Sequence, residues 1–209
     1  MSHAVSTLAV NVELTNTPPF NGSMVRSDIM SVATLLFPPE IFVDQVLVTI
    51  RDASIRIPGS SVPFHQHARQ AASLAERAAL PDHLVGAALL YGVGELMVRS
   101  WSRHPAFEHA PTEPTQAAVA HLGSHLPDPV LEPIRLLPDA KRYLDAGSSG
   151  LTATAPQRRF ETELHAADAV ELALIDQRAG NREMITPKLD HYRDLLWELC
   201  ATRTQAVPA

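Results

Sequence analysis

The clearest pattern of apolar and polar positions lies between Phe64 and Leu80. Apolar side chains recur there at spacings of three and four residues, and charged side chains occupy other positions. This is the spacing of one face of an amphipathic helix, and the many alanines on that face favour close packing against neighbouring helices. The apolar positions are Phe64, Ala68, Ala71, Ala72, Ala75, Ala78 and Ala79.

Other helices follow from the same spacing rule. Residues 84–90 are apolar on nearly every face, which predicts a helix buried in the middle of a bundle, begun by Pro81-Asp82 and ended by Gly92 and Gly94. Between proline-rich spacers, shorter helices are expected over 116–122 and 130–137. Upstream, from Glu40, apolar side chains also follow helical spacing, although their β-branched residues leave a strand open as an alternative: Val43, Val46, Leu47 and Ile50.

The C-terminal part predicts two more helices. One long helix is expected over 157–178, closed by Gly180, with one apolar face made of Phe160, Leu164, Ala167, Val170 and Leu174. A last helix is expected from about Lys188, with Leu189, Tyr192, Leu196 and Leu199 in phase. The Gly/Ser/Thr-rich stretch at 146–156 predicts an exposed loop between helices.

These elements predict an all-α helical domain over residues 39–209, preceded by an irregular arm over 1–38. The arm is rich in Ser, Thr, Asn and Pro, and its alternation from Leu8 to Leu14 is either one short strand or nothing regular. It could pack on a second subunit, so a homo-oligomer is one expectation.

Composition narrows the classes of partner. The chain has 209 residues, 45% hydrophobic and 19% charged, which is typical of a soluble globular protein. A net charge of −6 without a Lys/Arg run argues against nucleic acid, and no apolar run reaches membrane-spanning length. The single Cys200 excludes an internal disulfide framework. We therefore expect a cytoplasmic protein with a small-molecule substrate or ligand.

Two polar residues sit on predicted apolar faces. His67 shares the face of Ala71 and Leu74, and Asp176 shares the face of Ala169 and Leu172. Both side chains should point inward, where an uncompensated carboxylate is costly. Something must satisfy Asp176, and a structural His–Asp pair is the simplest solution.

In order and spacing, several segments resemble the HD-domain superfamily, and most closely its di-iron, phosphonate-cleaving oxygenases and their predicted phosphohydrolase relatives. The segments are FHQHARQ at 64–70, LVGAALLYGVGE at 84–95, AKRYL at 140–144, HAADAV at 165–170 with Asp176, and LDHYR at 189–193. The resemblance implies an HD-domain-like helical bundle, and in that family a cage of His and Asp side chains holds two metal ions.

The resemblance also implies that this metal cage is degenerate here. His67 matches the first His of the family and Asp176 matches the last Asp. The four other ligand positions hold Tyr91-Gly92 in place of the His-Asp pair, Glu113, and Leu137. Without the carboxylate that bridges the two ions, we expect no metal and no cofactor. Lys141 matches a lysine that helps hold the anionic substrate in the family.

With the metals gone, Tyr91, Glu95, Glu113, His67 and Asp176 remain as candidate catalytic residues and Lys141 as a substrate-binding residue. Crowded carboxylates should either pair with His67 or Lys141 or have a raised pKa, and a phenol can donate a hydrogen bond to a carbonyl. The first hypothesis is a metal-free isomerase, lyase or cyclase of specialised metabolism. The alternative is a non-catalytic relative that uses the bundle to bind a small ligand or a protein.

Overall fold

The computed structural model describes residues 38–56, 60–103, 107, 109–148 and 154–206. Within these ranges the regular elements are helices, so the all-α expectation is confirmed. The first of them, α2 (Pro39–Asp52), excludes the strand alternative for 43–50. The expected alternation from Leu8 to Leu14 lies outside the described residues. Of the described helices, none combines the length and the apolar character needed to cross a bilayer.

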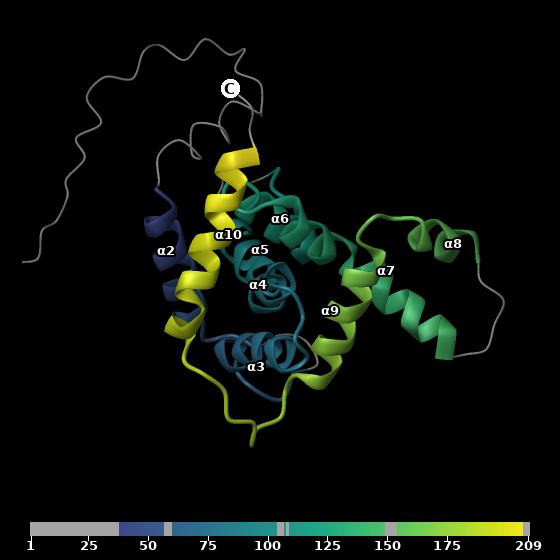
Figure 1. Ribbon diagram of the computed structural model, residues 1–209, viewed down its shortest axis with the longest axis horizontal. Coiled ribbons are helices and arrows are strands. Elements are labelled where there is room, and N and C mark those ends of the chain that lie inside the picture. Colours follow the sequence, from purple (N-terminus) through teal and green to yellow (C-terminus); the bar gives the residue numbers. More distant parts are fainter. Residues whose placement is uncertain (1–37, 57–59, 104–106, 108, 149–153, 207–209) are drawn as a thin grey trace, which may run out of the picture.

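Helix α4 (Asp82–Leu90) is the centre of the bundle, as its all-round apolar sequence predicts. Each side chain from Leu84 to Leu90 is buried. Four other helices pack against α4: α3 (Phe64–Arg77), α7 (Asp128–Ser148), α9 (Ala166–Arg178) and α10 (Arg193–Ala206). Figure 1 shows α4 seen nearly end-on, with these helices around it. Residues from distant parts of the sequence therefore meet around α4.

The helix predicted from Pro81-Asp82 ends just before Gly92 as expected, whereas Gly94 lies inside the next helix, α5 (Val93–Trp101). α4 does stop at Leu90, but α5 begins at Val93 after a two-residue turn. Helix α6 (Pro114–Leu122) then packs against α5 so closely that a Cβ on Gly94 would overlap the carbonyl of Pro114. Gly94 thus permits close backbone approach rather than ending a helix.

Helix α7 is 21 residues long and continues through Pro133 and Pro138, so the expected short helix over 130–137 was too short. Each proline removes one helical hydrogen bond. Burial of Val130, Ile134 and Leu137 along the same stretch offsets that loss. In Figure 1, the C-terminal half of α7 extends away from α4 and carries α8 (Ala155–Glu161) beside it.

The single long helix expected over 157–178 is wrong, because α8 and α9 are separated by residues 162–165. The Thr162 hydroxyl donates to the Arg159 carbonyl at 2.7 Å, and such side-chain bonding competes with helix continuation. Leu164, expected on the apolar face, is 91% exposed in this turn. The buried face of α9 is instead made of Ala166, Ala169, Leu172, Ala173 and Ile175.

The connection between α9 and the last helices is tied to α3 through Gln70, which is fully buried. The backbone N–H of Gly180 donates to Gln70 Oε1 at 2.6 Å, and Gln70 Nε2 donates to the carbonyl of Asn181. Gly180 has a φ of 109°, which favours glycine, and α9 ends at Arg178 as that glycine predicted.

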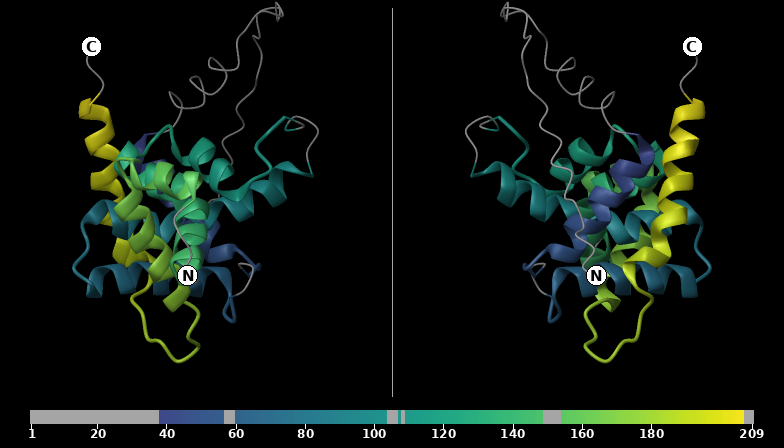
Figure 2. Two further views of the ribbon diagram at one scale, coloured as in Figure 1. Left: turned by 90° about the vertical axis from the view of Figure 1, so that its right-hand side faces the viewer. Right: turned by 90° about the vertical axis from the view of Figure 1, so that its left-hand side faces the viewer.

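The C-terminal helices close the bundle along one edge. A short 3₁₀ helix, η2 (Leu189–Tyr192), leads into α10, and the predicted in-phase residues Leu189, Tyr192, Leu196 and Leu199 are all buried. α10 lies beside α2, as Figure 2 shows from the side. Cys200 on α10 is 2% exposed, and burial raises the pKa of its thiol to about 12.

Candidate functional site

Four of the six predicted site residues meet in one group, which we call the His67 group: His67, Tyr91, Lys141 and Asp176. Each comes from a different element, namely α3, the turn after α4, α7 and α9. They meet because α3, α7 and α9 all pack against α4. His67 and Tyr91 are buried, the Asp176 side chain is 14% exposed, and that of Lys141 is 44% exposed. The group therefore runs from the core to the surface.

Asp176 is the hub of the His67 group. Its Oδ1 lies 3.0 Å from His67 Nε2 and accepts a hydrogen bond from the Tyr91 hydroxyl, while its Oδ2 lies 2.6 Å from Lys141 Nζ. Burial alone would raise the pKa of this carboxyl, but hydrogen bonds from His67, Lys141 and Tyr91 outweigh burial and hold the pKa below its usual range. Asp176 is thus a carboxylate, as the sequence analysis expected of a paired acid.

The Tyr91 hydroxyl contacts both the His67 ring and the Asp176 carboxylate. Its hydroxyl oxygen lies 2.5 Å from His67 Nε2 while its proton is donated to Asp176. Burial, and then the negative charge of Asp176, raise the pKa of the phenol well above its usual value. Tyr91 therefore acts as a hydrogen-bond donor and not as a phenolate.

These contacts define the tautomer of His67. A carboxylate accepts hydrogen bonds only, and the Tyr91 proton already goes to Asp176, so the hydrogen on the ring must be on Nε2. The opposite ring nitrogen, Nδ1, lies 3.0 Å from Ser60 Oγ. In the neutral ring, Nδ1 is then the lone-pair nitrogen and accepts from the Ser60 hydroxyl.

Glu95 and Glu113 are placed differently from the carboxylates of the His67 group. Glu113 is exposed at the N-cap of α6, and Glu95 is half-buried in the first turn of α5. Within the described ranges, no hydrogen bond or ion pair joins either residue to His67, Tyr91 or Asp176. Of the three carboxylates expected to crowd there, Asp176 is therefore the one bonded to His67, Tyr91 and Lys141 in the described part of the chain.

The His67 group contains one carboxylate, that of Asp176, and this carboxylate is paired with hydrogen-bond donors. In the described part of the chain, no three His, Cys, Asp or Glu side chains come together as a set that could hold a metal ion. The cation beside the Asp176 carboxylate is instead the ammonium of Lys141, and the third neighbour is the neutral Tyr91 hydroxyl. The group suits proton handling and hydrogen bonding.

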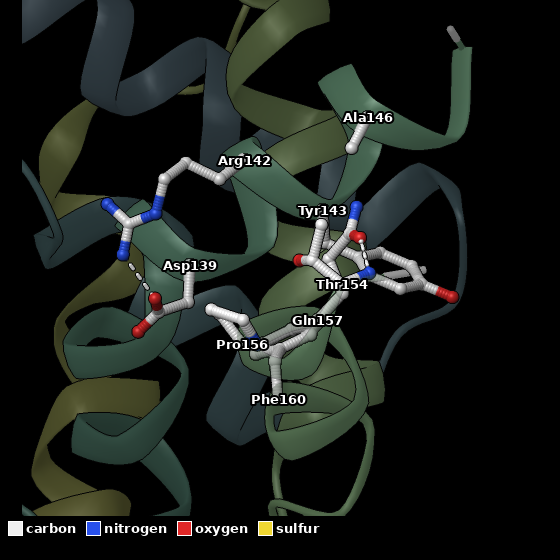
Figure 3. A pocket seen from close by; sticks show the side chains of 8 residues that line it. All are labelled: Asp139, Arg142, Tyr143, Ala146, Thr154, Pro156, Gln157 and Phe160. Atoms are coloured by element: carbon white, nitrogen blue, oxygen red, sulfur yellow. Dashed lines mark hydrogen bonds and ion pairs between the residues drawn. The ribbon is translucent and has the colours of Figure 1, made fainter. Parts of the chain in front are cut away.

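A separate pocket of about 330 Å³ lies between α7 and α8. Tyr143, Pro156 and Phe160 form apolar walls, and Arg142, paired with Asp139, lies at one side, as Figure 3 shows. No member of the His67 group lines this pocket. Lys141 precedes Arg142 on α7, but its side chain turns to Asp176 instead.

The sequence predicted all four members of the His67 group but not the contact of His67 with Ser60. Helical phase placed His67 and Asp176 correctly, because both lie on regular helices. Ser60 precedes α3 in a segment without regular structure, where no periodicity indicates the direction of a side chain. Neither a protein-family model nor a curated protein sequence matches the chain. Functional inference therefore depends on the geometry.

Proposed function

We propose that the chain is a metal-independent enzyme on an HD-like helical scaffold, an isomerase, lyase or cyclase that moves a proton on a small molecule. The observation that carries this proposal is the pairing of His67: Nε2 is anchored to Asp176 at 3.0 Å, and Nδ1 faces a half-buried hydroxyl instead of the core. A ring fixed in this tautomer presents Nδ1 as a general base.

The other members of the group have supporting roles in this proposal. Asp176 orients His67 and stabilises the imidazolium that forms when Nδ1 takes a proton. Tyr91 keeps that carboxylate hydrogen-bonded in the buried half of the group. Lys141, the most exposed member, supplies positive charge where an anionic or carbonyl oxygen of a substrate would enter.

A second candidate function is ligand binding without catalysis. The observation that favours it is the α7–α8 pocket, which is shaped by Tyr143 and Phe160 and is separate from the His67 group. Leu137, at a position where the resembling family has a ligand, is buried in the core. A scaffold that kept the bundle and lost the chemistry would show both features.

Exchange of substrate hydrogens for deuterium separates the two candidates. A panel of small ketones, ketoacids and thioesters is incubated with the full chain in D₂O, and loss of the proton signal beside each carbonyl is followed by NMR. A proton-transfer enzyme speeds exchange in at least one compound. Tyr91→Phe, which removes the hydroxyl beside the base, should slow that exchange by about 100-fold.

Glu113→Gln is the matched control, because Glu113 is exposed and outside the His67 group. It should leave exchange unchanged, whereas His67→Gln should abolish it. If no compound exchanges faster than in buffer, and a ligand is found that shields the side chains of the α7–α8 pocket from solvent, ligand binding without catalysis is supported instead.

A further inference from the structure

Ser60 completes a line of three polar groups. Its Oγ lies 3.0 Å from Nδ1 of His67, and Nε2 of the same ring lies 3.0 Å from Oδ1 of Asp176. A hydroxyl, an imidazole and a carboxylate in this order are the arrangement that activates a serine for attack on an acyl group. Compared with the serine-protease template, the two ring nitrogens have exchanged partners, but the ring still links hydroxyl to carboxylate.

The two residues that follow Ser60 hold it in place. The backbone N–H of Val62 donates to Ser60 Oγ at 3.3 Å, and the Val62 side chain is buried. The Ser61 hydroxyl donates to the carbonyl of Gly180 at 2.5 Å, across to the loop after α9. Ser60 itself is half-buried, and its Oγ also lies 3.3 Å from the Val62 carbonyl, which the hydroxyl can reach as an alternative acceptor to His67 Nδ1.

We propose that Ser60 is a nucleophile that accepts an acyl group from an ester or thioester of a small molecule. This inference rests on the proposed role of His67 as a base and adds a covalent step to it. It also names a substrate class, because the leaving group must be an alcohol or a thiol that can take up a proton.

Acyl transfer to Ser60 and the hydrolysis that follows need one reactant besides the ester or thioester, which is water. Ser60 Oγ forms a bond to the acyl carbon while its proton passes to Nδ1 of His67, and Asp176 stabilises the imidazolium at Nε2. The bond from the acyl carbon to the leaving oxygen or sulfur breaks, and that atom takes the proton from Nδ1. Water then attacks the acyl-Ser60 ester by the same route and releases the carboxylic acid.

A fluorophosphonate carrying an alkyne tag tests the nucleophile directly, because it forms a stable phosphonyl ester with an activated serine and releases fluoride. The full chain is treated with the probe and the modified peptide is mapped by mass spectrometry. We expect the adduct on Ser60 and none on the exposed Ser102, whose hydroxyl donates to the Arg99 carbonyl. This readout on the wild-type chain requires no variant.

Variants then connect the adduct to the line of three groups. Ser60→Ala and His67→Gln should abolish labelling, Asp176→Asn should slow it at least tenfold, and Ser102→Ala should leave it unchanged. If a serine-hydrolase standard is fully modified under the same conditions and Ser60 is not, the proposal is overturned.

Nitrogen-15 NMR of the His67 ring distinguishes failure of this step from failure of the proposed function. A ring protonated at Nε2 with a lone pair on Nδ1, together with an unlabelled Ser60, overturns the nucleophile and leaves the base intact. A ring protonated at Nδ1 overturns both. The Nε2 form with a labelled Ser60 supports both.

Discussion

Asp176 shows how this fold tolerates a carboxylate in a largely buried position. Its two oxygens accept hydrogen bonds from His67, Tyr91 and Lys141. Among these three donors, Lys141 is the one that carries a full positive charge whether the His67 ring is neutral or protonated. The carboxylate is more stable here than in water because these hydrogen bonds outweigh its desolvation. The same pairing that suits Asp176 to orient His67 therefore also contributes to folding.

The lowered pKa of Asp176 predicts a specific loss of stability in acid. A carboxyl whose folded pKa lies below its unfolded value of about 3.9 stabilises the fold above that pH and loses the contribution as the pH falls below it. Asp176→Asn should lower the free energy of unfolding by about 2 kcal/mol at pH 7. The difference from wild type should shrink as the pH falls below about 4.

Urea unfolding at a series of pH values measures this difference. Asp139→Asn is the matched control, because Asp139 pairs with Arg142 on the surface of α7, and exposed pairs contribute little. Its difference from wild type should stay small throughout the range. A wild-type minus Asp176→Asn difference that does not change with pH would contradict the assignment of a stabilising carboxylate.

At the scale of elements, most helices were predicted but their ends less well, and α5 was not predicted. Periodicity identified α3 and α10 because each has a buried stripe, and α4 was identified by its apolar residues on nearly every face. It joined α8 to α9, since apolar residues at a suitable spacing hid the turn at 162–165. It also stopped short of the full length of α7, because prolines usually interrupt helices whereas here packing overrides them.

The C-terminal end of α3 contains a residue that strains the backbone. Ala79 has a φ of 53°, in the left-handed region where a Cβ is unfavourable, and it is exposed. Ala79→Gly should therefore raise stability by about 1 kcal/mol, or about 2–4 °C in Tm. Calorimetry of the two proteins checks this, and a lower Tm for the glycine variant would show that this conformation is not strained.

The contact between α5 and α6 gives the opposite prediction for a glycine. Gly94→Ala places a Cβ against the rigid backbone of Pro114, so we expect a loss of about 3 kcal/mol or more. Gly147→Ala is the control, because a Cβ at Gly147 meets no atom within 4 Å and favours helix α7. Urea midpoints should fall for the first variant and hold or rise for the second.

At the scale of the whole molecule, the arrangement of helices about α4 determines which side chains contact one another in the His67 group, and the sequence could not predict those contacts. The inward orientation of His67 and Asp176 followed from the period of their own helices, but the contact of Asp176 with Lys141 depends on how α7 packs against α9. Ser60 lies before α3 and Tyr91 just after α4, so their partners depend on tertiary packing alone. Glu113 belonged to the resembling pattern but faces solvent at the start of α6.

The alkylation rate of Cys200, which is buried on α10, reports how often α10 separates from the rest of the bundle. A thiol with a pKa near 12 and 2% exposure is inert to iodoacetamide until α10 leaves the bundle. Its alkylation rate should therefore be far below that of glutathione. Arg203→Ala should accelerate it by removing the bond that Arg203 donates to the Leu126 carbonyl at 2.8 Å. If Cys200 in the folded protein is alkylated as fast as glutathione, α10 separates from the bundle readily under native conditions, which would contradict this prediction.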